Sequence, residues 1–374
     1  MKKIILLCLI ILPFFITSCK KDNNPVDTAA VENQKIIDQL KYLTDSTMQN
    51  SQITGICAVI VDHKKGLNWS YAAGLASILD KKPISLDNTF RIGSVTKTMV
   101  ATVALQMVDE GKLSLNDKLS KFFPQYPKAD SVTLTMLLNM TSGIPEYSSD
   151  SVFTQTLVSN PTKVWLPQEL INLAFSHPYV FTPGTENRYT NTNYIILGLI
   201  IEKITGSTLK AEIETRIIRK LQLTNTGFLN SGVTFPGNNA KGYYFGSYIE
   251  NDEYTNRYDI SWGWAAGSGY STPLELQKYG EALVNGGLLS DAMQQNRMTD
   301  YYNPEGGVTY YGLGMKRFGS FFGHTGGLHG YQTIMFHSKE KNATIVVLYN
   351  CTLYPHNPIQ LAFKFIEVLY GEKY

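Results

Sequence analysis

The sequence predicts an α+β protein, in which strands from both ends of the chain form one sheet and a mostly helical lobe is inserted between them. Runs rich in β-branched and aromatic residues gather near the two ends, at 53–62, 67–73, 331–337 and 343–350. Apolar residues recur at helical spacing in two terminal segments, at about 31–48 and 359–369. We therefore expect an N-terminal and a C-terminal helix to flank the sheet, with the helical lobe at about 94–225.

Within the predicted lobe, four apolar segments have helical character: 95–108, 134–138, 166–175 and 193–206. The apolar run 194–201 is too short to cross a bilayer and is better explained as part of a buried helix that ends near Gly206. Another helix is expected over 273–285, because Thr272-Pro273-Leu274-Glu275 forms a capping box with proline in its first turn. The stretch 226–270 is rich in Tyr, Gly and Asn, which predicts loops and short strands.

Composition and charge exclude several classes of protein. The chain has 374 residues, of which 43% are hydrophobic and 17% charged, and only 15 prolines, which excludes a largely disordered or collagen-like polymer. Its 33 Lys and Arg face 31 Asp and Glu, and Lys2 and Lys3 lie in a segment expected to be removed, which leaves 31 against 31. A protein without a basic excess or stripe is not expected to bind nucleic acid.

The N-terminal segment predicts export and anchoring. Residues 1–18 combine two lysines with an apolar stretch, as a secretory signal peptide does. The segment runs into Ile16-Thr17-Ser18-Cys19, which resembles the bacterial lipobox, whose cysteine is lipidated and becomes the new N-terminus. Residues 19–33 are polar and predict a flexible tether before a folded domain at 34–374. We expect a cell-envelope protein of the outer membrane or periplasm, held on a membrane by lipid at Cys19; the alternative is a soluble secreted protein.

Two cysteines would remain in the folded domain. Removal of Cys8 and lipidation of Cys19 would leave Cys57 and Cys351 in an oxidising compartment. Both lie in or beside β-like runs. Two buried thiols, or one disulfide if the two strands are neighbours, are both compatible with the sequence.

Ser94 and Lys97 are the first candidates for chemistry. Ser94 follows a short β-like run and begins an apolar helix, where an offset of three residues puts both side chains on nearly the same face. A desolvated lysine with a lowered pKa can remove the proton of a serine hydroxyl and so make a nucleophile. Lysine also follows Ser18, Ser207 and Ser338 by three residues, but only Ser94 precedes a helix that is hydrophobic on nearly every face.

Two other motifs carry polar groups suited to acyl transfer. Tyr189-Thr190-Asn191 supplies a phenol that can relay protons and an amide that can bind both a lysine and a substrate carbonyl. Gly323-His324-Thr325-Gly326-Gly327 is unique in the chain, and its glycines would let a substrate backbone approach a strand edge. A backbone N–H near Gly327 could complete an oxyanion hole with that of Ser94. The alternative for His324 is a turn residue; a metal site is not expected, because no other ligand has a suitable spacing.

Together these motifs and their flanking sequences resemble the serine β-lactamase and penicillin-binding-protein superfamily, above all its class C-like branch. The resemblance runs from about 50 to 350 and includes FRIGSVTKTMVATVALQMVDEG, FTPGTENRYTNTNYIILGL and GHTGGLHGY. It implies a β-lactamase/transpeptidase-like fold with an antiparallel sheet, and a serine hydrolase that needs no cofactor or metal. The branch also contains D-Ala-D-Ala carboxypeptidases, D-stereospecific aminopeptidases and esterases.

The resemblance implies a role for each of the first two motifs. Ser94 would be the acylated nucleophile, and Lys97 and Tyr189 would share the general acid and base work as a coupled pair. Asn191 would orient the amide on the acyl side of the substrate. The backbone N–H groups of Ser94 and Gly327 would hold the oxyanion.

The third motif departs from the Lys-Thr-Gly of most β-lactamases. His324 and Thr325 would meet the leaving group or a substrate carboxylate, beside the backbone of Gly326 and Gly327. Because an imidazole titrates near neutrality, attraction of a carboxylate by His324 is expected to be weak and pH-dependent. We therefore expect a hydrolase of small-molecule or peptide substrates, chiefly D-amino-acid peptides or β-lactam-like compounds. The alternatives are a carboxylesterase of the same fold and a catalytically idle sensor that binds muropeptides.

Aromatic residues of the loops after 226 leave two interpretations open. They line a substrate cleft, or they pack the lobe against the sheet. The residues concerned are Tyr243, Tyr244, Trp262, Trp264 and Tyr270.

Overall fold

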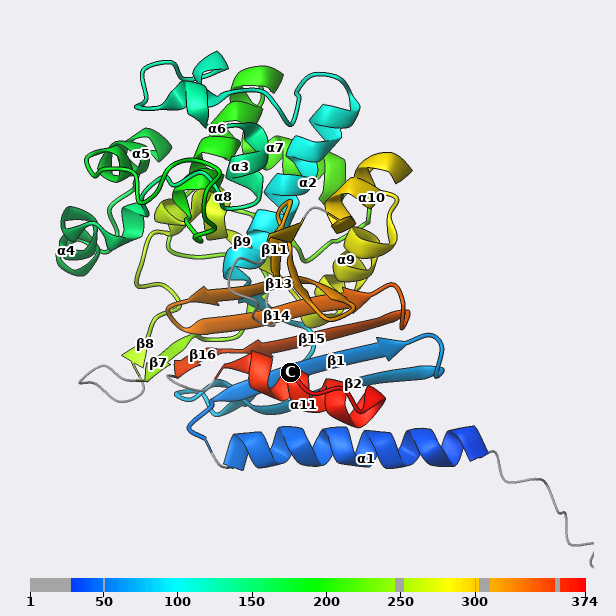
Figure 1. Cartoon of the computed structure of the whole chain (residues 1–374). Coiled ribbons are helices and arrows are strands. Elements are labelled where there is room, and N and C mark those ends of the chain that lie inside the picture. Colours follow the sequence, from blue (N-terminus) through cyan, green and yellow to red (C-terminus); the bar gives the residue numbers. More distant parts are fainter. Residues whose placement is uncertain (1–27, 50, 246–251, 300, 303–309, 354–356) are drawn as a thin grey trace, which may run out of the picture.

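The computed structural model (Figure 1) describes residues 28–49, 51–245, 252–299, 301–302, 310–353 and 357–374. The predicted signal peptide, Cys19 and residues 20–27 of the predicted tether lie outside these residues. Figure 1 shows a sheet with a helical lobe on one side and two terminal helices, α1 (Thr28–Gln49) and α11 (Pro358–Tyr370), on the other. Among the described helices, none combines the length and the apolar character that a membrane span needs.

One large antiparallel sheet crosses the molecule. In the described part of the chain its strands are β1 (Gly55–Asp62), β2 (Leu67–Ser77), β3 (Lys82–Pro83), β10 (Tyr301–Tyr302), β11 (Tyr310–Gly312), β12 (Lys316–Phe318), β13 (Phe321–Leu328), β14 (Tyr331–Ser338) and β15 (Ala343–Tyr349). Their order is β10-β11-β12-β13-β14-β15-β1-β2-β3. The two ends of the chain meet where β1 pairs with β15, with Val59 opposite Val346. The expected α+β fold with an antiparallel sheet is confirmed.

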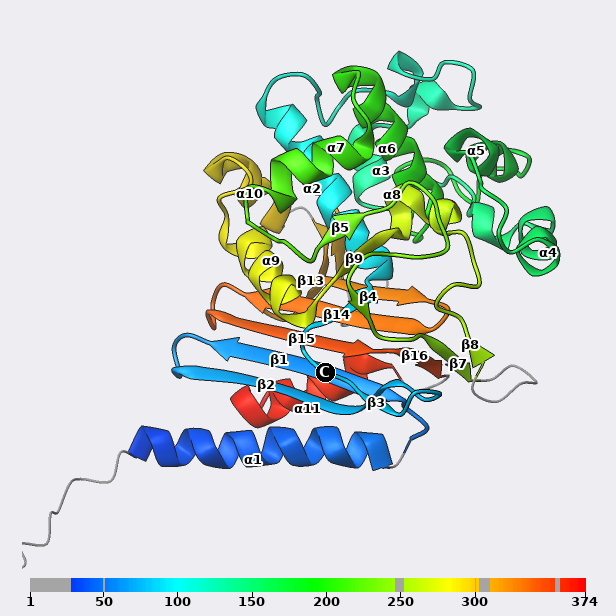
Figure 2. The same cartoon turned by 180° about the vertical axis from the view of Figure 1, so that it is seen from behind.

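Two hydrophobic cores lie on opposite faces of this sheet. Successive strand residues point to opposite faces, so the neighbours Ile345 and Val346 enter different cores. On the face of α1 and α11, Trp69 of β2 meets Phe365 of α11 edge to face, with ring centroids 5.7 Å apart. On the other face, α9 (Pro273–Asn285) contacts β14, β15 and β1, and Figure 2 shows the lobe beyond it.

The lobe is built around two buried helices that contact each other, α2 (Thr96–Asp109) and α6 (Thr192–Thr205). Both are apolar on nearly every side, which is typical of helices surrounded by protein. Gly206 ends α6 with a φ of 67°, a left-handed conformation that glycine adopts without a steric cost. The other helices are α3 (Leu134–Leu138), α4 (Ser151–Ser159), α5 (Pro167–Phe175), α7 (Leu209–Ile213), α8 (Trp264–Gly267) and α10 (Asp291–Thr299).

Short turns and strands join the lobe to the sheet. The single-turn elements are η1 (Gly93–Val95), η2 (Leu119–Lys121), η3 (Ala129–Ser131), η4 (Tyr147–Ser149), η5 (Glu214–Ile218) and η6 (Ile260–Trp262). The short strands are β4 (Asn88–Arg91), β5 (Gly227–Phe228), β6 (Asn238–Asn239), β7 (Tyr243–Phe245), β8 (Asp252–Glu253), β9 (Gly269–Ser271) and β16 (Cys351–Leu353). They form two small sheets, ordered β5-β9-β4-β6 and β16-β7-β8.

Two sequence predictions about helix ends need correction. α1 begins at Thr28, so residues 28–33 are helical and do not belong to a flexible tether. Thr272 does cap α9 by accepting a hydrogen bond from the backbone N–H of Glu275. The Glu275 carboxylate, however, does not accept a hydrogen bond from the backbone N–H of Thr272, as a capping box requires. It accepts hydrogen bonds from Asn225 and Thr226 and so links α9 to the segment before β5.

Cys57 and Cys351 are both buried free thiols. Cys57 on β1 faces the core beneath the lobe, whereas Cys351 on β16 belongs to the core beneath α11. The large sheet lies between these cores, so the structure favours two separate thiols over one disulfide. Burial raises the pKa of both thiols, that of Cys351 to about 12, which keeps them protonated and unreactive at neutral pH.

We expect peptide mapping to find both cysteines unpaired. Protein that is denatured without reductant in the presence of iodoacetamide should yield peptides in which Cys57 and Cys351 each carry a carbamidomethyl group. Reductant should leave the midpoint of thermal unfolding unchanged, because it has no cross-link to remove from this domain. A peptide pair linked through Cys57 and Cys351 would contradict the arrangement.

Candidate active site

Ser94 lies in the tight turn η1, immediately before α2. The backbone of Gly93 has a φ of +50°, a conformation that favours glycine, and so turns the chain sharply from β4 into η1. The hydroxyl of Thr96 donates to the carbonyl of Gly93 and accepts from the backbone N–H of Gly269, which fixes the turn against β9. Ser94 is half-buried, whereas Lys97, one turn further on, is completely buried.

The Lys97 amine contacts three oxygen atoms. Its Nζ lies 2.9 Å from Ser94 Oγ, 2.7 Å from Asn191 Oδ1 and 2.7 Å from the carbonyl oxygen of Ala266 in α8. An ammonium group can donate to all three. A neutral amine can donate to Asn191 and Ala266 and accept the Ser94 proton on its lone pair. The same geometry thus accommodates Lys97 before and after it takes up a proton.

Burial brings the pKa of Lys97 to about 7. Desolvation is the largest cause, since it penalises the charged form, and the nearby ammonium of Lys316 acts in the same direction. The carboxylate of Glu146 opposes both by favouring the ammonium. A substantial fraction of Lys97 is therefore a neutral amine near pH 7.

The second motif precedes α6 and reaches the same point. Lys97 Nζ lies 4.9 Å from the centroid of the Tyr189 ring, and the Tyr189 hydroxyl forms a hydrogen bond with Ser94. Desolvation raises the pKa of Tyr189, and the hydrogen bond to Ser94 lowers it by a smaller amount. Although 38% of the residue as a whole is exposed, protein surrounds its hydroxyl group. The Glu146 carboxylate accepts from the backbone N–H of Asn191 and so holds this segment in place.

The third motif is itself a strand, β13, and its glycines pack against the turn that carries Ser94. A Cβ atom on Gly326 would lie only 2.0 Å from the carbonyl oxygen of Ile92, and one on Gly93 would lie 2.7 Å from the nitrogen of Gly327. Only glycine permits so close an approach. It places Gly327 directly beside Gly93, the residue that precedes Ser94. Among the described strands, β12 pairs only with 321–323 of β13 on that side, so the edge beyond is open.

His324 differs from the sequence prediction. It is not a turn residue, and its side chain is completely buried on the lobe side of β13. Its Nδ1–H donates to the carbonyl of Thr325, which leaves Nε2 to accept from the Tyr311 hydroxyl at 3.2 Å. Desolvation, followed by the charges of Lys316 and Lys97, lowers the pKa of His324 well below its usual value. The expected titration near neutrality is therefore wrong: His324 stays neutral.

Lys316 is a site residue that sequence analysis missed. It lies on β12, and its Nζ donates to Thr325 Oγ1 at 2.9 Å and stands 5.7 Å from the centroid of the Tyr189 ring. Desolvation lowers the pKa of Lys316 to about 8. No motif marks it in the sequence. Only the pairing of β12 with β13, in which Lys316 lies opposite Gly323, reveals that it reaches the site.

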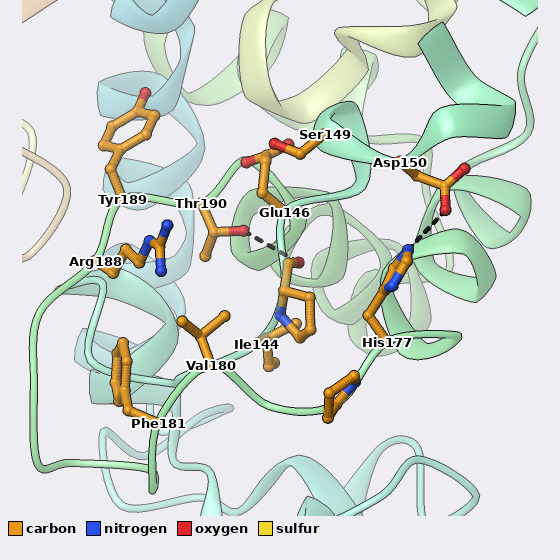
Figure 3. Close-up of a pocket in the computed structure, with 12 residues that line it drawn as sticks. Ile144, Glu146, Ser149, Asp150, His177, Val180, Phe181, Arg188, Tyr189 and Thr190 are labelled. Atoms are coloured by element: carbon orange, nitrogen blue, oxygen red, sulfur yellow. Dashed lines mark hydrogen bonds and ion pairs between the residues drawn. The ribbon is translucent and has the colours of Figure 1, made fainter. Parts of the chain in front are cut away.

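Two cavities border these residues. One, of about 240 Å³, lies beyond Tyr189 and Thr190, and Figure 3 shows Arg188 and Tyr189 on one side and the hydrogen-bonded side chains of Asp150 and His177 on the other. The second, of about 370 Å³, is lined by Lys316, the third motif, β14 and the start of α11. Small-molecule sites usually enclose about 300–1,000 Å³, so the second cavity has the size of such a site and the first is somewhat smaller.

The aromatic residues singled out after 226 favour core packing over a substrate cleft. Trp264 and Tyr243 are buried core residues, and Trp264 packs directly on Gly198 of α6. Trp264 therefore supports packing of the lobe, whereas Tyr243 belongs to the core on the α11 face of the sheet. Trp262, Tyr244 and Tyr270 are only half-buried, but none of them lines either cavity.

Comparisons with known proteins agree with this geometry. The family model described as Beta-lactamase matches residues 40–362. The putative penicillin-binding protein PbpX of Bacillus subtilis is 26% identical, over 89% of this chain and 77% of that protein. Among solved structures, a D-stereospecific amidohydrolase from Streptomyces sp. has a TM-score of 0.78 and 26% identity, over 91% of this chain and 99% of that one.

A D-amino acid amidase from Ochrobactrum anthropi SV3, complexed with D-phenylalanine, shares the fold. Its TM-score is 0.79 at 24% identity, over 90% of this chain and 99% of that one. The fold, the family match and the convergence of three motifs on Ser94 point to one conclusion. This chain belongs to the beta-lactamase family, as a hydrolase of the serine β-lactamase and penicillin-binding-protein fold.

Proposed function

We propose that this chain is a cell-envelope serine hydrolase that cleaves amide bonds of D-amino-acid peptides, or of β-lactam-like compounds, through an acyl-enzyme on Ser94. The observation that carries the proposal is the contact between the buried amine of Lys97 and Ser94 Oγ. The similarity to a D-stereospecific amidohydrolase and to a penicillin-binding protein supports the substrate class.

The acylation step follows from the contacts of Lys97. Its neutral amine takes the Ser94 proton while Ser94 Oγ bonds to the substrate carbonyl carbon. The negative charge that develops on the carbonyl oxygen is stabilised by the backbone N–H groups of Ser94 and Gly327. Asn191 accepts from the Lys97 ammonium through its oxygen and has its N–H₂ group left to orient a substrate carbonyl.

Collapse of the intermediate requires a proton for the leaving nitrogen. Tyr189 holds a proton at neutral pH because desolvation raises its pKa. The phenol therefore donates its proton to the leaving nitrogen and recovers one from the Lys97 ammonium, whose Nζ lies 4.9 Å from the centroid of the Tyr189 ring. In deacylation a water molecule attacks the acyl carbon and passes its proton through Tyr189 to the Lys97 amine. The bond between the acyl carbon and Ser94 Oγ then breaks, and the Lys97 ammonium returns this proton to Ser94 Oγ, which restores the free enzyme.

We also propose that lipid at Cys19 anchors the protein on the envelope. The apolar segment before Cys19 supports this location. Residues 20–27 would then separate the lipid from the first residue of α1, Thr28. Several acyl chains, each methylene contributing about 0.8 kcal/mol on burial, hold such a protein stably on a bilayer.

Ser94 should be the single site of covalent modification by acylating reagents. After exposure to a fluorophosphonate or a penicillin, intact-mass analysis should find one adduct, and peptide mapping should locate it on Ser94. The Ser94→Ala variant should form none, while Ser207→Ala, which removes another serine with a lysine three residues later, should react as the wild type does. An adduct on the Ser94→Ala protein would contradict the mechanism.

The rate of hydrolysis of a neutral aryl ester should report the titration of Lys97. With a base whose pKa is about 7, kcat/KM should rise as the pH increases through 7 and level off above it. Lys97→Met should abolish most of the activity, and the activity that remains should no longer rise as the pH increases through 7. Lys203→Met removes a lysine that donates to the Phe122 carbonyl far from the site, and this variant should retain both the activity and its rise through pH 7. A profile that is flat through pH 7 would contradict the assignment of Lys97 as the base.

Anchoring can be tested separately from catalysis. In a bacterial host fed an alkyne-labelled fatty acid, the full-length protein should acquire the label and fractionate with membranes. Cys19→Ala should remain unlabelled, whereas Cys57→Ala, at a buried thiol, should be labelled normally. Label that persists in Cys19→Ala would contradict the proposed anchor.

A further inference from the structure

Tyr189 lies in a segment without regular secondary structure. Residues 186–190 belong to no helix or strand, so no ladder of backbone hydrogen bonds fixes the position of the Tyr189 phenol. Transfer of the phenol proton to the leaving nitrogen nevertheless requires this ring to stay beside Ser94. Contacts from another part of the lobe must therefore hold the backbone around Tyr189.

Met140 holds this backbone on both sides of Tyr189. The N–H of Arg188 donates to the Met140 carbonyl oxygen at 3.0 Å, and the N–H of Thr190 donates to Met140 Sδ at 3.5 Å. The sulfur also accepts from Asn193 Nδ2, in the first turn of α6, at 3.7 Å. A thioether is a weak acceptor, but Met140 is completely buried and Thr190 is only 3% exposed. Without the sulfur, the Thr190 N–H would be a buried donor with no acceptor in the described part of the chain.

The backbone of Met140 adopts a conformation that its residue type disfavours. It follows α3 with a φ of +66°, and the N–H of Thr141 donates to the carbonyl of Met136, which is the longer bond of a Schellman motif. Glycine is the usual residue in this left-handed position, because it has no Cβ atom. Methionine is less favoured there, but it supplies a sulfur atom that glycine lacks. A disfavoured conformation beside a reactive group indicates a function for the residue that adopts it.

We propose that Met140 is a positioning residue, whose carbonyl and thioether together hold Tyr189 in place for the transfer of its proton to the leaving nitrogen. The inference rests on the proposed function for the role of the phenol, whereas the contact itself can be measured without catalysis. Substitution of the side chain leaves the carbonyl in place, so a variant isolates the contribution of the thioether.

The leaving group of the substrate distinguishes positioning of Tyr189 from general support of the fold. A p-nitroanilide needs a proton on its leaving nitrogen, whereas a p-nitrophenyl ester releases a stable phenolate without one. The measurement is kcat/KM for these two derivatives of N-acetyl-D-alanine. Met140→Leu keeps an apolar side chain of similar size and removes the sulfur. We expect kcat/KM to fall about 3–10-fold for the anilide, as for the loss of one weak hydrogen bond, and less than about twofold for the ester.

Met107→Leu is the matched control. Met107 is also completely buried, at the end of α2 remote from Ser94, and its sulfur accepts no hydrogen bond from the described residues. This variant should leave both values of kcat/KM unchanged. An equal loss on the two substrates in Met140→Leu, or no loss on either, would overturn the proposal.

A second measurement needs no turnover. In the Ser94→Ala protein, hydrogen exchange followed by NMR should find the Thr190 amide exchanging about 3–10-fold faster after Met140→Leu is added, and unchanged after Met107→Leu. Unchanged exchange at Thr190 in Met140→Leu would also overturn the proposal. Faster exchange at Thr190, in a protein whose wild type forms no adduct on Ser94, would instead retain Met140 as the support of this segment and overturn the proposed function.

Discussion

The site depends on one interaction, the burial of the Lys97 amine against Ser94 Oγ. In water a lysine is almost entirely protonated at neutral pH and cannot accept a proton from a hydroxyl. Enclosure between α2, α6 and α8 removes the water that stabilises the ammonium, while Asn191 and the Ala266 carbonyl keep the amine hydrogen-bonded in either state. The helical lobe is therefore more than a cover for the sheet, because its packing density determines the basicity of Lys97.

The second constraint is the contact between the sheet and the turn that carries Ser94. Gly326 and Gly327 of β13 lie so close to Ile92 and Gly93 that a methyl group on Gly326 or on Gly93 would separate the two segments. The backbone N–H groups that would stabilise an oxyanion thus come from two different layers of the fold. Their spacing is fixed by contact between main chains, which cannot change rotamer as a side chain can.

The sequence contains enough information for the architecture but not for the electrostatics of the site. Long apolar runs predict α2, α6, β1 and β15 because burial on all sides leaves a clear pattern. No strand pattern marks β13 in the sequence, because its glycines have low β-propensity and allow the turn that carries Ser94 to approach closely. The three motifs could be singled out by residue type, whereas the neutrality of His324 and the arrival of Lys316 depend on strand pairing and on which face a side chain occupies. Those facts are non-local, so no short sequence window contains them.

The pairing of β1 with β15 also has a consequence for how the protein matures. Two strands separated by about three quarters of the chain form the centre of the sheet, which gives the fold a high contact order and a slow approach to the native state. A nascent chain cannot assemble this centre until its last strands have been synthesised. A chain that ends prematurely lacks the support for β13, and so it exposes an incomplete sheet to quality-control proteases before it can attack any substrate.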